Sequence, residues 1–140
     1  MLNYLKGSAS AIIVAVLTLT FASNIMFKDF SFSFADIYFV LVYASIIGYL
    51  LGVLGQVCIF LIKRRNNGNG KSILLFLFLG GISGIIVEFI MEWSFAPLII
   101  ISTILGALAF WRVQKIQIKV YSFIISVLPL TIIVLFPFFM

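Results

Sequence analysis

The chain has 140 residues, of which 64% are hydrophobic and only 9% are charged. Soluble domains carry roughly 25% charged residues, so four acids and nine bases supply too little polar surface for a water-soluble fold. The chain has no histidine and one cysteine, Cys58. These counts exclude an intrachain disulfide, the usual zinc and iron–sulfur sites, histidine-held haem, and catalysis by Ser-His-Asp or Cys-His sets. We therefore expect an integral membrane protein without a cofactor or a metal site.

Five apolar runs each come close to the roughly 20 residues that a helix needs to cross a bilayer. None shows the alternation of polar and apolar residues that is typical of a membrane β-barrel strand. We therefore expect an all-α transmembrane bundle that forms a single domain. Its predicted spans are residues 9–26, 37–62, 73–90, 95–111 and 120–139.

Positive charge between these runs predicts the orientation. Residues 63–71 (KRRNNGNGK) look like a solvated loop, since Asn and Gly favour turns. If five helices cross the membrane, this loop, Lys6 and the break at 112–119 fall on one side, and only Lys28 falls on the other. Cytoplasmic breaks gather lysine and arginine, so we expect the N-terminus inside and the C-terminus outside. The charges expected at the anionic headgroups of the inner leaflet are Lys63, Arg64, Arg65, Lys71, Arg112, Lys115 and Lys119.

Two alternatives stay open at this stage. The first run, with Lys6 before it and Thr20-Phe21-Ala22 near its end, also resembles a secretory signal with a cleavage site. The last break is either a short amphipathic turn on the inner leaflet or an extended strand over residues 115–119. The net charge of +5 does not indicate a nucleic-acid partner, because the bases are few and confined to the breaks.

A carboxylate lies inside the third predicted span. Gly81, Gly84 and Glu88 are three and four residues apart, so they share a helix face. An ionised carboxylate in hydrocarbon costs about 3 kcal/mol or more, so such a residue usually has a partner or a function. Glu88 either carries a proton or a cation, with Gln56 of the second span beside the pathway, or makes a polar contact within the bundle. The second, structural interpretation is the preferred one.

Small residues also form a stripe on the second predicted span, at Gly48, Gly52 and Gly55. Such stripes allow helices in a membrane to approach closely, within one chain or between copies. Together with Gly81 and Gly84, this stripe predicts a close contact between the second and third spans. Ser102 and Gly106 form a shorter stripe of the same kind in the fourth span.

The layout resembles a group of small, uncharacterised multi-pass membrane proteins of Gram-positive bacteria. The features in common are a KRR-plus-Asn/Gly inner loop at 63–71, a GGxxG…E third span from Gly80 to Glu88, and the total length. This resemblance implies a location in the bacterial cell membrane and no catalytic activity. Small drug exporters are of similar size, but they are typically four-span proteins with the glutamate in the first span. This chain departs from them in both respects.

We therefore expect a non-enzymatic membrane protein that acts through helix contacts with itself, as a homo-oligomer, or with another membrane protein. Breaks this short leave almost no mass outside the bilayer for another kind of surface. The alternative is a small proton- or cation-coupled transporter or channel that uses Glu88. An intramembrane enzyme is the least favoured class, because acid chemistry of that kind needs two carboxylates from facing elements.

Overall fold

The computed structural model describes residues 2–26, 33–64, 69–90, 97–116 and 119–138. Over these residues the chain forms five α-helices, followed by a 3₁₀ turn, and no strand. The prediction of an all-helical fold is therefore confirmed for the described part of the chain. The elements are α1 (Leu2–Met26), α2 (Phe34–Arg64), α3 (Asn69–Ile90), α4 (Leu98–Val113), α5 (Lys119–Leu135) and η1 (Phe136–Phe138).

Three of the helices are long and apolar enough to cross a membrane. The qualifying segments are Asn3–Ile25, Ala35–Ile62 and Gly70–Ile90, whereas α4 and α5 are apolar but have only 16 and 17 residues. At 1.5 Å per residue, α4 is about 24 Å long, somewhat short of a bilayer core of about 30 Å. The structure thus supplies three full-length candidate spans and two shorter apolar helices.

The helices run further into the polar breaks than the hydropathy predicts. α1 begins at Leu2, not Ala9, and includes Lys6; α2 continues to Arg64 and α3 starts at Asn69. Helices therefore take up most of the predicted 63–71 loop. Lysine and arginine are good helix formers, so a helix does not stop where the apolar run stops.

The start of α2, in contrast, is marked by a specific capping residue, the serine that precedes it. The backbone N–H and hydroxyl of Ser33 donate to the Asp36 carboxylate over 2.9 and 2.7 Å, and the Asp36 N–H donates back over 3.2 Å.

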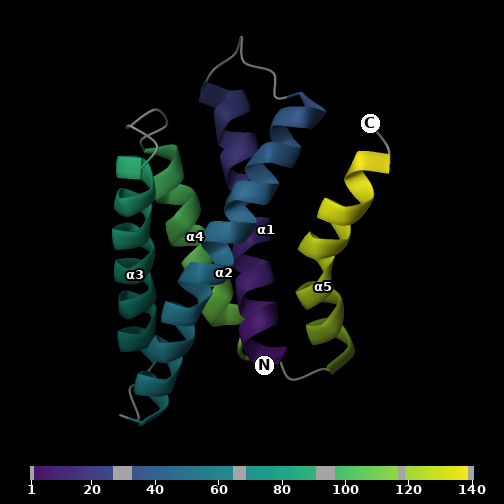
Figure 1. Ribbon diagram of the computed structural model, residues 1–140. Coiled ribbons are helices and arrows are strands. Elements are labelled where there is room, and N and C mark those ends of the chain that lie inside the picture. Colours follow the sequence, from purple (N-terminus) through teal and green to yellow (C-terminus); the bar gives the residue numbers. More distant parts are fainter. Residues whose placement is uncertain (1, 27–32, 65–68, 91–96, 117–118, 139–140) are drawn as a thin grey trace.

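Successive helices alternate in direction, so the first and last helical residues lie at opposite ends of the bundle (Figure 1). α1 is the central helix and packs against α2, α4 and α5, whereas α3 packs mainly against α4. α2 crosses obliquely and touches α3 at few places. The small-residue stripes of the second and third spans therefore do not pack against each other as expected, and α2 and α3 meet only where Ile59 and Phe76 share a cluster among the described residues. Each small-residue stripe has found a different partner helix.

The last helix contains Pro129 and stays helical on both sides of it. Its buried side is small and polar, at Ser122, Ser126 and Pro129. At its far end, η1 returns to the start of α2, where the Phe136 and Tyr38 rings stack with centroids 5.3 Å apart and planes 15° apart. The break before α5 contains turns at residues 114 and 115 and no strand among its described residues. The strand alternative therefore fails for the described part of this break.

Candidate binding cavity between four helices

The stripe on α2 packs against α1 and α4. A Cβ atom built on Gly48 would overlap the side chain of Ile12, and one built on Gly52 would overlap the Ser8 hydroxyl. At Gly55 the added atom would come 3.0 Å from Cε1 of Phe110. These glycines therefore bring the α2 backbone close to its neighbours within the same chain. The partner of Gly52 comes from the first turns of α1, which lie outside the span predicted from hydropathy.

The stripe on α3 has a different register from the one predicted. An added Cβ on Gly80 or Gly84 would come 2.7 Å from the Cα of Ile104 or Ile100, both in α4. Gly81, which the sequence placed on the packing face, has nothing within 4 Å of its added Cβ. Residues four apart form the ridge that meets the neighbouring helix here, so Gly80 takes the position expected for Gly81. The i, i+4 pair Gly80–Gly84 was a readable signal that the sequence analysis passed over.

α4 completes the packing against the central helix. A Cβ on Gly106 would come 3.0 Å from the carbonyl oxygen of Ala11 and 3.6 Å from Cβ of Ala15. The backbones of α1 and α4 are thus in near contact at this point. With α2 on α1 and α3 on α4, two close helix pairs face each other. α2 and α3, the outer members, do not close the space between them.

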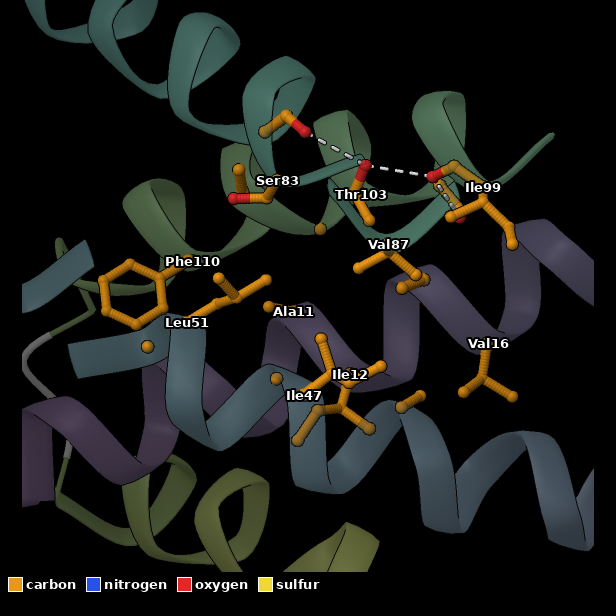
Figure 2. A pocket seen from close by; sticks show the side chains of 18 of the residues that line it. Ala11, Ile12, Val16, Ile47, Leu51, Ser83, Val87, Ile99, Thr103 and Phe110 are labelled. Carbon is orange, nitrogen blue, oxygen red and sulfur yellow. Dashed lines mark hydrogen bonds between the residues drawn. The ribbon is translucent and has the colours of Figure 1, made fainter. Parts of the chain in front are cut away.

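A cavity of about 250 Å³ fills that space (Figure 2). Side chains from all of the first four helices line it. They include Ala11 and Ile12 of α1, Ile47 and Leu51 of α2, Val87 of α3 and Phe110 of α4. The small residues of the stripes, such as Gly48, Gly52, Gly80 and Gly106, also face it. A hollow between close-packed helices is therefore a direct product of the glycine and alanine positions.

Two hydroxyl groups of α4 in the cavity wall already have hydrogen-bond acceptors. Ser102 donates to the Ile99 carbonyl over 2.9 Å. Thr103 is within 3.0 Å of the Gly80 carbonyl and 2.9 Å of the Ile99 carbonyl, so it also ties α4 to α3 (Figure 2). A hydroxyl bonded to its own helix offers little to a ligand. The wall is consequently apolar in its chemistry, although it contains serine and threonine.

Aromatic rings close the cavity toward the end of the bundle where α3 begins. The Phe76 and Phe110 rings stack with centroids 6.0 Å apart and planes 25° apart. Both are buried, and Ile59 of α2 joins them in one apolar cluster. This cluster is where α2 comes close to α3. Beyond it the two helices diverge toward the opposite end (Figure 1), and the cavity, which residues of both helices line, is partly open.

Glu88 is fully buried on the face of α3 that carries Gly80 and Gly84. It is not among the residues that line the cavity. Gln56 lies about two turns before the end of α2, and Glu88 lies within the last turn of the antiparallel α3, so they belong to opposite ends of the bundle. The structure does not bring the two predicted polar residues together. The other described carboxylate, Asp36, is exposed and bonded to Ser33.

The end of the bundle with the N-terminus of α1 carries the described basic side chains. Lys71 and Arg112 are exposed there, and the Lys115 ammonium lies 4.3 Å above the centroid of the Trp111 ring. Lys6 differs from them, because it is 2% exposed and its Nζ donates to the Ile116 carbonyl over 2.6 Å. Gln114 donates to the Asn3 carbonyl over 2.7 Å. These two bonds fasten the start of α1 to the turn after α4.

Among the described residues, no three His, Cys, Asp or Glu side chains come together as metal ligands would. Of the predicted charges, Arg65 lies outside the described residues, while Lys63, Arg64 and Lys119 occupy helix ends. Searches against protein-family models, curated proteins and solved structures find no match to this chain. The proposals below therefore depend on the residues and the geometry of this chain.

Proposed function

We propose that this protein is an integral membrane protein of five spans, with its N-terminus on the cytoplasmic side and its C-terminus outside. It is non-enzymatic and acts through contacts made within the bilayer, with another copy of itself or with a membrane partner. The resemblance to small membrane proteins of Gram-positive bacteria favours the bacterial cell membrane as its location. Its basic end then meets the anionic headgroups of the inner leaflet.

The observation that carries this proposal is the distribution of apolar side chains. Many of the large ones point outward, with Phe78, Phe89 and Phe21 between 70 and 73% exposed. Small and polar residues are buried instead, including serines of every helix, such as Ser8, Ser45 and Ser83. Soluble proteins rarely expose contiguous apolar patches of more than a few hundred Å². Hydrocarbon is the solvent in which this surface is stable.

The charge distribution supports the orientation. Lys71, Arg112 and Lys115 lie at the end of the bundle that also carries Lys6. The lengths of the last two helices are compatible with crossing, because α5 and η1 together run from 119 to 138 and local thinning of the bilayer accommodates a short helix such as α4.

The test has two parts. Flotation of the expressed protein with membranes that have been washed in alkaline carbonate tests its location, and recovery in the soluble fraction contradicts the proposal. Contacts with a copy or a partner are tested by cross-linking in membranes from single cysteines on the outer faces of α2 and α3, at Leu50 and Phe78, in a Cys58→Ser background. Specific cross-linked products are expected. Products that appear equally at every exposed position contradict the contact proposal.

Complete burial of Glu88 favours one further candidate function, proton- or cation-coupled transport. A buried carboxyl that changes its charge during transport would make flux depend on Glu88. In proteoliposomes, Glu88→Gln then abolishes a proton or cation flux that the parent protein and the Asp36→Asn control both show. Equal flux in the parent and in Glu88→Gln removes Glu88 from this role.

A further inference from the structure

The cavity between α2 and α3 has a wall that is almost wholly apolar, and the Ser102 and Thr103 hydroxyls in it are bonded to backbone carbonyls, so it suits an apolar occupant. We propose that it holds one acyl chain of a membrane phospholipid, which enters between α2 and α3. This inference depends on the membrane location proposed above and deepens it, since it names a ligand.

The extent of the cavity wall decides between a lipid chain and a protein helix. A stable protein interface buries about 800 Å² on each partner. The wall of this cavity exposes far less surface than that. A helix of a second copy or of another protein would therefore make no stable interface there, whereas an unbranched hydrocarbon chain needs only a small apolar wall.

The volume is ample for hydrocarbon. An apolar cavity of about 150 Å³ in another protein stays free of water and takes up benzene. Here the walls come from Leu79 and Val87 of α3, Ile47 and Leu51 of α2, and alanines of α1. Because these walls are made of packed helices that share glycine contacts, the volume does not collapse on its own.

The aromatic cluster determines which way the chain points. Phe76 and Phe110 close the cavity at the basic end, so the methyl end of the chain comes to rest near them. One leaflet provides about 15 Å of hydrocarbon, which equals about ten residues of helix. Ten residues counted back from Ile90 along α3 end at Gly80, which is about one turn away from Phe76. The headgroup then belongs to the leaflet opposite the basic end.

The test uses phosphatidylcholine vesicles that contain a phosphatidylcholine with a photoactivatable diazirine at the end of one acyl chain. After illumination, mass spectrometry measures the fraction of each α3 residue that carries the label. Leu79 lines the cavity, and its neighbour Phe78 is 72% exposed to the surrounding lipid. We expect the label on Leu79 to exceed that on Phe78. Labelling of Leu79 that is equal to or lower than that of Phe78 overturns the proposal.

Two variants fill the cavity. Ser83→Leu and Val87→Trp both add bulk to its α3 wall, and each is expected to remove the excess label on Leu79. Gly81→Leu is the matched control, because its added side chain meets open space on the same helix and leaves the excess unchanged. Val87→Trp decides the matter if Ser83→Leu does not fold. Persistence of the excess in a folded filling variant contradicts the proposal.

Two other measurements separate the possible failures. If the protein does not float with the vesicles, the membrane location itself fails. If it floats but shows no excess label, only the acyl-chain proposal fails. A disulfide formed between two copies through Leu79→Cys, in a Cys58→Ser background, shows that a second copy occupies the cavity and overturns the proposal.

Discussion

α2 lies close to α1 because glycine has only a hydrogen atom where other residues have a side chain. Gly52→Ile places a branched side chain where Ser8 and Tyr4 already lie, with Cβ of Ser8 3.1 Å from the added Cβ. Overpacking of this kind costs about 1–3 kcal/mol. We expect a lower midpoint of thermal unfolding in detergent, measured by circular dichroism. Gly81→Ile is the control, because its side chain meets nothing within 4 Å; an equal loss in both variants contradicts the assigned contact.

The second prediction at this scale concerns Lys6, whose ammonium is buried and bonded to the Ile116 carbonyl. Lys6→Met removes that donor and leaves the carbonyl without it, which costs about 1–2 kcal/mol. We expect a lower unfolding midpoint, followed by circular dichroism in the same detergent. Lys115→Met serves for comparison, because an exposed cation over a ring contributes less, about 0.5–1 kcal/mol. A larger effect at Lys115 than at Lys6 would be inconsistent with the bond to Ile116.

The residue types predicted which helix faces carry small side chains. The crossing of the helices determined which residues of those faces make the contacts. The sequence identified Gly48, Gly52 and Gly55, and all three lie at helix contacts. It chose Gly81 instead of Gly80, because spacings of three and four both place residues on one face and only the crossing of the two helices selects between them. For Lys6 the sequence predicted only that it lies on the same side of the membrane as the basic loop. Its burial depends on a carbonyl 110 residues away, which no local pattern encodes.

At the scale of elements, α5 is held to the bundle by its small side. Ser126 is 4% exposed, and its hydroxyl donates to the Ser122 carbonyl over 2.6 Å. Ser126→Leu adds two heavy atoms beyond the position of the serine hydroxyl where α5 packs on α1. We expect partial release of α5, seen as faster proteolysis in detergent between α4 and α5. Ile124→Leu, at a residue that is 51% exposed, is expected to behave like the parent protein. Unchanged proteolysis in Ser126→Leu rules out this packing role.

Existence and order of the helices were predictable, whereas their partners were not. Continuous apolar runs predicted all five α-helices, because only helices and closed barrels satisfy the backbone in hydrocarbon and barrel strands alternate polar with apolar residues. Their ends moved by several residues, as at α1, since helix propensity continues past the hydrophobic edge. A stripe of small residues shows that a helix approaches closely and does not say which helix. The α2 stripe therefore met α1, and the α3 stripe met α4.

At the scale of the whole molecule, the position of positive charge predicts the orientation in the membrane. Replacing Lys63, Arg64, Arg65 and Lys71 together with asparagine removes much of the bias toward the cytoplasmic side. We expect a measurable fraction of inverted molecules, detected by labelling cysteines placed at either end with an impermeant reagent in intact cells. Replacement of Lys28 alone is expected to leave the orientation as it is. A parent protein labelled at both ends from the same side contradicts the five-span arrangement.

The cavity belongs to the part of the molecule that the sequence could not predict. It arises because two tight pairs, α1 with α2 and α3 with α4, leave α2 and α3 apart. The glycines that form the contacts of each pair can be recognised in the sequence of each helix separately. The space left between the pairs depends on the angle at which α2 crosses, and that angle follows from packing in three dimensions.

The central place of α1 has a consequence for how the chain assembles. Residues that enclose this helix come late in the chain, for α4 begins at Leu98 and α5 at Lys119. A nascent molecule that has made only α1, α2 and α3 therefore has neither Ile116 to accept from Lys6 nor Phe110 to cover Gly7. Until synthesis passes those positions, the polar start of α1 has to be sheltered by water, headgroups or the insertion machinery. The bundle therefore cannot reach its final packing before its fourth helix has been synthesised.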